Sequence, residues 1–208
     1  MLFNQIDNLL ESEKERNLYY KFFCGYYFNE LVDGFNERIT NFNEIINTQC
    51  IDYINSEKLN IQLSAADSHV TFDVHSYLIC KTDRGELADI FIMDNKNKIC
   101  IAIEAKFLTD WGFVKDVVQN SIRIKSCSEK LKDYIFIQCL LIKESKWNEV
   151  IKLKNHPSSN YTRLKNQTEI PLFVLTWETL INSVPDENIK ITSRIIGEKQ
   201  ERFSNGIK

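Results

Sequence analysis

The sequence predicts an α/β fold, and three observations lead to this expectation. A long amino-terminal stretch has apolar residues at helical spacing. A central stretch contains short segments rich in β-branched and aromatic residues, separated by polar turns. A helical segment follows, and after it comes a nearly continuous apolar segment that is typical of a strand buried on both faces. The expected order of the core is therefore α-β-β-β-α-β.

The apolar spacing predicts helices from Gln5 to about Ser56, where residues such as Leu18 and Phe22 recur at three- and four-residue steps. A turn is expected at 81–85 and a hairpin loop at 94–98. A polar loop is expected through Pro157 and Asn166. The other expected elements, in order, are strands at 70–80, 87–93 and 99–105, a helix at 112–131, a strand at 133–141, a helix around 144–154, a strand at 171–176 and a C-terminal helical region.

The length and composition fit one globular domain. The chain has 208 residues, of which 43% are hydrophobic, and this is enough to build a full core. We expect a single domain over 1–208, with a helical N-terminal extension at 1–60. The core is expected at 70–142, and further helices and a strand at 143–208.

Charge and cysteine spacing narrow the class of protein. A net charge of -3 argues against a general nucleic-acid coat protein. A local basic segment at 143–165 nevertheless contains Lys152 and Lys154, which are candidates for nucleic-acid contact unless they are simply solvated. The six cysteines form no CxxC pair, which argues against a zinc site or a disulfide framework. The start of the chain has no signal-peptide pattern and no apolar run is long enough to span a membrane, so a cytoplasmic protein with no membrane partner is expected.

Three charged residues stand out between 86 and 106. Asp89 lies near the start of one predicted strand, and Glu104 and Lys106 end the next. Because side chains alternate faces along a strand, Glu104 and Lys106 are expected on one face, and antiparallel pairing can bring Asp89 onto it. Two acids can hold Mg²⁺ through oxygen ligands, and a lysine can orient or deprotonate a water. A metal-dependent phosphodiesterase needs these groups.

Two sequence motifs lie on the two predicted strands that are joined by a short hairpin, and they resemble motifs of the PD-(D/E)XK nuclease superfamily. They are Gly85-Glu-Leu-Ala-Asp-Ile and Ile103-Glu-Ala-Lys. The resemblance covers about 70–140. It implies a restriction-endonuclease-like αβββαβ core with a mixed sheet. The family usually has a proline before the first acid, and this chain has Ala88 there instead, which leaves the acid in place.

The resemblance also implies roles for individual residues. Asp89 and Glu104 would be metal ligands together with the backbone carbonyl of Ala105, with Mg²⁺ as the cofactor and Mn²⁺ as a substitute. Lys106 would position or activate the attacking water. The helix that follows would contribute a glutamine or a basic residue to the site. The best matches are Gln119, as a catalytic residue, and Arg123, as a phosphate contact. An additional acid from an earlier helix would be Glu37 or Glu44.

These expectations describe a metal-dependent endonuclease that cleaves double-stranded DNA, similar to prokaryotic restriction or anti-phage defence nucleases. Two alternatives stay open, namely a non-catalytic nucleic-acid- or protein-binding module on the same fold, and an RNA-cleaving enzyme. Simpler explanations also exist for the residues. Glu104 and Lys106 can form a solvated pair, Asp89 can be the polar start of a strand, and Gln119 can lie on the surface. The aromatic residues at 19–28 suit either helix packing or a homodimer interface.

Overall fold

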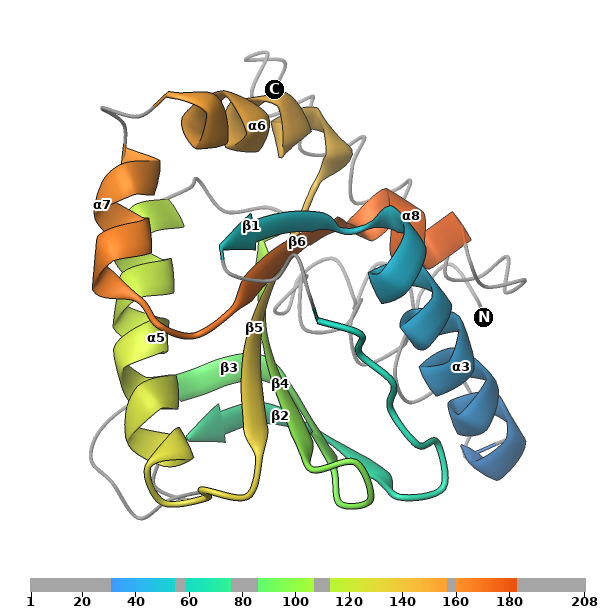
Figure 1. Ribbon diagram of the computed structural model, residues 1–208. Coiled ribbons are helices and arrows are strands. Elements are labelled where there is room, and N and C mark those ends of the chain that lie inside the picture. The colour runs from blue at the N-terminus through green and yellow to red at the C-terminus, as the bar shows by residue number, and fades with distance from the viewer. Residues whose placement is uncertain (1–30, 55–58, 76–85, 107–112, 157–159, 183–208) are drawn as a thin grey trace, which may run out of the picture.

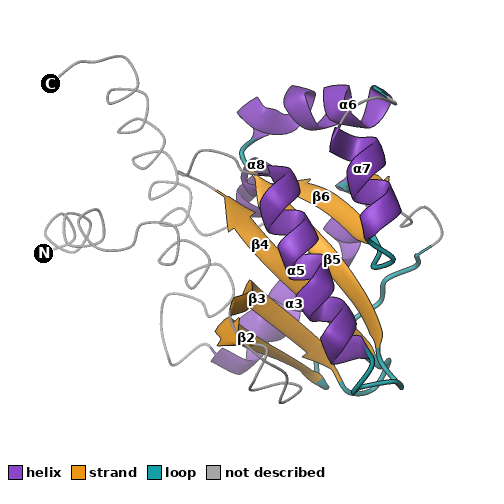
Figure 2. Ribbon diagram, turned by 90° about the vertical axis from the view of Figure 1, so that its left-hand side faces the viewer, coloured by secondary structure: helices purple, strands orange, loops and turns teal. Residues whose placement is uncertain are grey.

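The computed structural model describes residues 31–54, 59–75, 86–106, 113–156 and 160–182. In this part of the chain a mixed sheet lies between two layers of helices (Figures 1 and 2). The elements, in chain order, are α3 (Leu31–Gln49), β1 (Ile51–Ile54), β2 (Ser68–His75), β3 (Glu86–Asp94), β4 (Ile99–Lys106), α5 (Phe113–Ser128), β5 (Ile135–Ile142), the 3₁₀ helix η1 (Glu144–Lys146), α6 (Trp147–Asn155), α7 (Asn160–Gln167), β6 (Leu172–Thr176) and α8 (Trp177–Asn182).

The sheet has six strands in the order β1-β6-β5-β4-β3-β2. The strands β4, β5 and β6 are parallel to one another, whereas β2, β3 and β1 pair antiparallel with their neighbours. The expected succession of three strands, a helix and a strand is confirmed from β2 to β5. Because β4, β5 and β6 are parallel, their carboxyl ends lie at one end of the sheet.

One face of the sheet packs against α3 and α8. The apolar stripe of α3, which includes Ile39 and Phe42, is buried against the odd-numbered residues of β4, such as Ile101 and Ile103. Trp177 of α8 joins the same cluster. The alternation of a strand therefore assigns the residues between them, including Glu104, to the opposite face.

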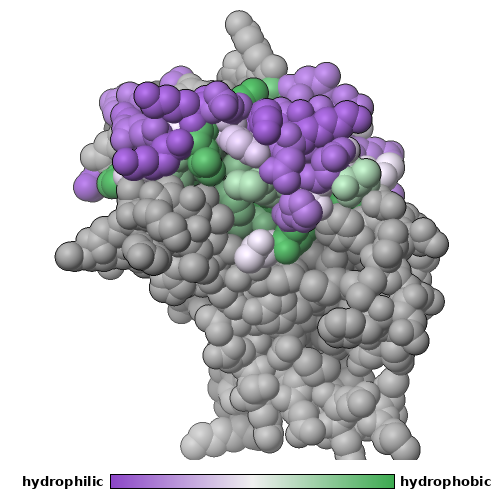
Figure 3. Space-filling model, turned by 90° about the horizontal axis from the view of Figure 1, so that it is seen from below, coloured by the Kyte–Doolittle hydropathy of each residue, from purple (hydrophilic) through white to green (hydrophobic). Residues whose placement is uncertain are grey.

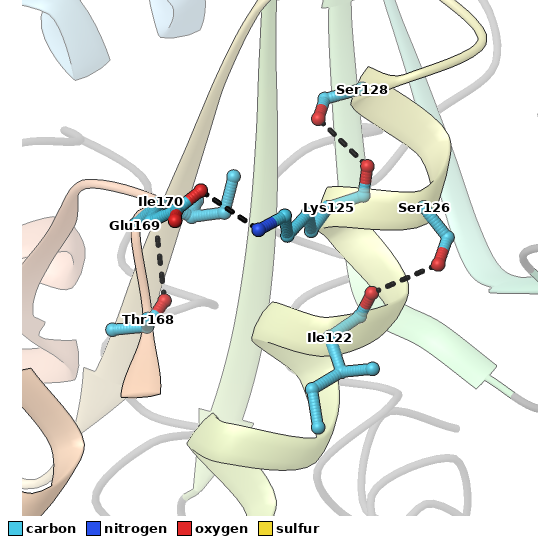
Figure 4. A network of polar contacts seen from close by, with 7 residues as sticks. All are labelled: Ile122, Lys125, Ser126, Ser128, Thr168, Glu169 and Ile170. Carbon is cyan, nitrogen blue, oxygen red and sulfur yellow. Dashed lines mark hydrogen bonds and ion pairs between the residues drawn. The ribbon is translucent and has the colours of Figure 1, made fainter. Parts of the chain in front are cut away.

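The opposite face is covered by α5 and α7, and α6 lies across the carboxyl ends of the strands (Figures 1 and 2). Ile124 and Cys127 of α5 pack on Phe91, Cys100 and Ala102. Towards the carboxyl ends of the strands, a second cluster joins α5, α6 and α7 to the sheet through Val117, Val150, Leu164, Leu140 and Val174. The far half of α5 is also tied to the segment before β6, because Lys125 Nζ lies 2.9 Å from a carboxylate oxygen of Glu169 (Figure 4).

Two elements differ from the sequence-based expectation. Residues 51–54, expected to end a helix, form the edge strand β1, in which Ile51 lies opposite Val174 of β6. The segment Ile-Asp-Tyr-Ile is short and rich in β-formers, so sheet pairing outweighs its helical spacing. Residues expected in a polar loop form α7, which packs against α5 and α6 and buries Leu164 completely. Burial of this one leucine stabilises a helix that local composition does not predict.

The turn between β3 and β4 closes around Asp94. Its buried carboxylate accepts hydrogen bonds from the backbone N–H groups of Ser64, Lys96 and Asn97 at 2.7, 2.8 and 3.1 Å, and from the Asn97 side-chain amide at 2.9 Å. Burial acts to raise the pKa of Asp94, but these hydrogen bonds outweigh it and hold the pKa below the usual 3.8. Lys98 completes the turn with a φ of 55°.

The surface on the side of this turn is mostly hydrophilic in the described part of the chain, with a smaller hydrophobic area between the polar side chains (Figure 3). Among the described residues, no helix combines the length and the apolar character needed to cross a membrane.

Candidate active site

The strands β3 and β4 separate at the level of the two predicted acids. Their pairing runs from Asp94↔Ile99 to Ile90↔Ile103 and goes no further in the described residues. Beyond that point β3 continues with β2, as far as His75↔Glu86, and β4 continues with β5. The sheet therefore forks, and the next residue on each arm of the fork is an acid: Asp89 on β3 and Glu104 on β4.

Asp89 bridges the start of this fork. Its Oδ2 accepts a hydrogen bond of 2.6 Å from the backbone N–H of Ala105. Ala105 stands two residues beyond Ile103 on the same strand, so its N–H points towards β3, where the ladder has ended. The carboxylate takes the place of a backbone acceptor and holds the two arms together. Asp89 is thus fixed beside the peptide that joins Glu104 to Ala105.

Glu104 is held from the helix layer. The side-chain amide of Asn120 on α5 donates a hydrogen bond of 2.8 Å to Oε2 of Glu104. Arg123, one turn further along α5, donates from its guanidinium to Oδ1 of the same Asn120 at 3.3 Å. Glu104 is half-buried and Asn120 is only 7% exposed. The site therefore has two carboxylates from neighbouring strands, each oriented by a hydrogen bond.

The position of α5 over the site depends on a second polar contact. Ser121 donates a hydrogen bond of 2.6 Å to the side-chain carbonyl of Gln138 on β5, and the Gln138 amide donates to the backbone carbonyl of Val117 at 3.4 Å. Both side chains are buried. Such contacts are directional, so they set the rotation and height of α5 on the sheet more narrowly than apolar packing does.

The other predicted residues have different outcomes. Lys106 ends β4, where its backbone lies opposite Ile142 of β5, and its side chain lies outside the described residues. The side chain of Gln119 is exposed, and the hydrogen bond to Glu104 comes from its neighbour Asn120. Glu44 is exposed on α3, a helix that covers the other face of the sheet, while the side chain of Glu37 lies outside the described residues.

The basic segment follows the same end of the sheet. Ile142, the partner of Lys106, lies two residues before η1, which leads directly into α6. Lys152 is exposed and Lys154 half-exposed in the last turn of α6. Figure 1 shows α6 beyond the carboxyl ends of β5 and β4, the end at which Glu104 lies.

The cysteines are structural residues as far as the described residues show. Cys100 and Cys139 are buried strand thiols, and burial raises the pKa of Cys100 to about 12 and also raises the pKa of Cys139. Thiols with raised pKa values are poor nucleophiles at neutral pH. Cys127 on α5 is disulfide-bonded, although the cysteine spacing argued against a disulfide framework, and its partner lies outside the described residues.

The donor set at the fork fits a hard divalent cation. Asp89 and Glu104 offer carboxylate oxygens from adjacent strands, and Ala105 offers a backbone carbonyl beside them; Mg²⁺ is usually held by one or two carboxylates, with water completing its shell. No cluster of three or more His, Cys, Asp or Glu side chains suited to a metal occurs within the described ranges. Among the described residues, the ligands that the fork offers to a metal are the two carboxylates and the backbone carbonyl of Ala105.

Sequence reasoning missed Asn120, although a signal was present. Val117, Ile124 and Cys127 form the buried stripe of α5, and Asn120 lies three residues after the first and four before the second. A polar residue on a buried helical stripe needs a partner, because an unpaired amide in the core is costly. The spacing alone could thus have marked Asn120, and Ser121 beside it, as residues with a specific contact.

Comparison of the chain with protein-family models, with curated proteins and with solved structures found no match.

Proposed function

We propose that this protein is a metal-dependent nuclease of the PD-(D/E)XK type, with a restriction-endonuclease-like core, that hydrolyses phosphodiester bonds in DNA. The observation that carries the proposal is the convergence of Asp89 and Glu104 where β3 and β4 separate, with Asp89 hydrogen-bonded to the backbone of Ala105 at 2.6 Å. The two carboxylates come from the sequence motif in which Asp89 on one strand is followed by Glu104-Ala-Lys106 on the next. The carboxylates are half-buried and held in place, as a preorganised ligand pair requires.

Asp89, Glu104 and the carbonyl of Ala105 would hold Mg²⁺, or Mn²⁺ in its place. When bound, the ion supplies Lewis-acid polarisation of the scissile phosphate. The protein's own residues provide the rest. Asn120 orients Glu104, and Asp89 fixes the backbone of Ala105. Lys106 would align the attacking water and stabilise the charge that develops on the phosphate oxygens.

The nucleic acid would approach from the carboxyl ends of β4 and β5. Lys152 and Lys154 of α6 lie at this end, where they can contact phosphates on either side of the cleaved bond. Arg123 of α5 is linked to the site through Asn120, to which its guanidinium donates a hydrogen bond of 3.3 Å. The net charge of -3 is compatible with this approach, because binding depends on the local surface and not on the total charge.

Cleavage of plasmid DNA by the purified 208-residue chain tests the proposal. We expect nicking or linearisation in Mg²⁺ or Mn²⁺ and none in excess chelator. Asp89→Asn and Glu104→Gln should each lower the rate at least about a hundredfold, because each removes a charged ligand while keeping its size. Asp133→Asn, an exposed change in the turn before β5, is the matched control and should cleave as the unaltered chain does.

The possible results separate the alternatives. Metal-dependent cleavage that survives Asp89→Asn and Glu104→Gln would contradict the assignment of the site. Binding of intact DNA in Mg²⁺ without cleavage would favour a non-catalytic binding module. Faster cleavage of single-stranded RNA than of duplex DNA, abolished by the same two substitutions, would keep the site and change the substrate.

A further inference from the structure

The amide of Asn120 has only one orientation that satisfies both of its neighbours. Its Nδ2 faces a carboxylate oxygen of Glu104, which can only accept, and its Oδ1 faces the guanidinium of Arg123, which can only donate. The reverse orientation would place oxygen against oxygen and N–H against N–H. The three side chains therefore form a directed chain of contacts from Arg123 to Asn120 to Glu104.

We propose that Asn120 and Arg123 are positioning residues that fix the Glu104 carboxylate for metal binding, with Arg123 acting through Asn120. This inference rests on the proposed function and assigns Arg123 a role other than phosphate contact. Groups that hydrogen-bond to metal ligands orient those ligands, and their loss typically lowers metal affinity by about 10–100-fold.

The location of the pair supports this role. Asn120 is 7% exposed and lies on the buried stripe of α5, so its amide has little freedom to turn towards solvent. The neighbouring contact between Ser121 and Gln138, at 2.6 Å, fixes the helix at the same level. Glu104, by contrast, lies just beyond the last residue pair between β4 and β3. Its side chain is therefore oriented from the helix layer, through the hydrogen bond from Asn120.

Binding of Mn²⁺ alone to the full chain, without nucleic acid, tests the inference. Paramagnetic resonance of free Mn²⁺ gives the dissociation constant. Asn120→Ala should weaken Mn²⁺ binding about tenfold. Arg123→Gln should weaken it about threefold, since it removes one long hydrogen bond that acts indirectly. In the Asn120→Ala background, Arg123→Gln should have no further effect, because the residue through which it acts is gone.

Matched controls separate this effect from general charge and helix effects. Arg163→Gln, an exposed arginine on α7, removes the same charge and should leave the Mn²⁺ affinity within twofold. Asn148→Ala, an exposed asparagine on α6, is the control for Asn120→Ala. Circular dichroism and thermal melting show whether each variant is folded. If Asn120→Ala does not fold, Arg123→Gln decides, because its side chain is partly exposed.

The outcomes distinguish the two proposals. If the unaltered chain binds Mn²⁺, Glu104→Gln abolishes binding and Asn120→Ala does not weaken it, the positioning role is wrong and the metal site stands. If Arg123→Gln lowers the Mn²⁺ affinity by the same factor in the unaltered chain and in Asn120→Ala, Arg123 does not act through Asn120 and has a separate role. If neither the unaltered chain nor Glu104→Gln binds Mn²⁺, the metal site fails and the positioning role fails with it.

Discussion

The carboxylate of Asp94 is buried and yet ionised, because donors from two segments converge on it. Three backbone N–H groups and one side-chain amide donate to its two oxygens. These contacts join the β3–β4 turn to the segment at Ser64, which precedes β2 in sequence. A buried carboxylate without such donors would be unfavourable, so the side chain and its partners must form as a unit.

Asp94→Asn should lower the free energy of unfolding at pH 7 by about 2–4 kcal/mol, because an amide nitrogen replaces one accepting oxygen and faces buried donors. The pKa of Asp94 is lowered in the folded state, so its contribution is present above the usual value of 3.8 and is lost as the pH falls through the folded value. The stability difference between the two proteins should therefore shrink below about pH 4.

Urea unfolding at pH 7, 5 and 3 measures this difference. Between pH 7 and pH 5 it should stay constant, and at pH 3 it should be smaller. Asp133→Asn, at an exposed position, should change stability by no more than about 0.5 kcal/mol. A difference for Asp94→Asn that is as large at pH 3 as at pH 7 would show that the ionised form does not carry the effect.

At the scale of elements, α5 is attached to the sheet by apolar packing and by one buried polar pair. Ser121 donates to Gln138, and both are surrounded by the apolar residues of α5 and β5. Ser121→Ala should lower the free energy of unfolding by about 1–3 kcal/mol, since it leaves the buried Gln138 oxygen without this donor. Ser126→Ala, on the exposed side of the same helix, should change it by about 0.5 kcal/mol or less.

A double-mutant cycle tests whether the two residues act as a pair. Ser121→Ala combined with Gln138→Leu should be less destabilising than the sum of the two single changes, because the double variant buries neither polar group. Thermal unfolding of the four proteins gives the coupling free energy. Additive effects would mean that the 2.6 Å contact contributes nothing specific to the docking of α5.

At the scale of the whole molecule, two pairs of lysines lie at opposite ends of the sheet. Lys152 and Lys154 are on α6, beyond the carboxyl ends of the parallel strands, while Lys130 and Lys132 are in the turn between α5 and β5 (Figure 1). All four belong to the same chain and carry the same charge. Replacing either pair changes the net charge by the same amount, but only one pair lies at the end of the sheet where Glu104 lies. Comparing the two replacements therefore separates the effect of local charge near the site from the effect of net charge.

Replacing Lys152 and Lys154 by Gln should weaken binding of duplex DNA and reduce the slope of log K against log salt by about 0.9 for each lost phosphate contact. The same replacement at Lys130 and Lys132 should leave the slope unchanged. Fluorescence anisotropy in Ca²⁺, over a series of salt concentrations, provides the measurement. Equal slopes for both double variants would show that α6 does not face the nucleic acid.

The sequence was sufficient to predict elements whose pattern is local. The strands β3, β4 and β5 and the helix α5 follow from apolar periodicity and from the polar turn at 94–98, and they are confirmed within a few residues. The mixed character of the sheet is confirmed as well. The edge strand β1 and helix α7 could not be predicted in this way, since each is stabilised by residues distant in the chain, such as Val174 beside Ile51.

The candidate site shows the same division. Asp89 and Glu104 were identified from their positions on two strands, and the structure brings them to one fork. Asn120 lies on the buried stripe of α5 and Gln119 does not, which spacing can show, but the contact of Asn120 with Glu104 depends on the level of α5 on the sheet, which the Ser121–Gln138 contact helps to set. Helical spacing gives the stripe but not the level at which the helix lies on the sheet.

The end of the β3–β4 ladder has a mechanical consequence. Within the described residues, five residue pairs, from Ile90 to Asp94, join the two strands, while the Glu86 end of β3 pairs with β2 and the Lys106 end of β4 pairs with β5. Asp89 and Glu104 thus stand on two arms that pair with different strands, and the hydrogen bond from the Ala105 N–H to Asp89 spans the two arms. The gap between the two carboxylates therefore depends on this side-chain contact as well as on the residue pairs of the β3–β4 ladder.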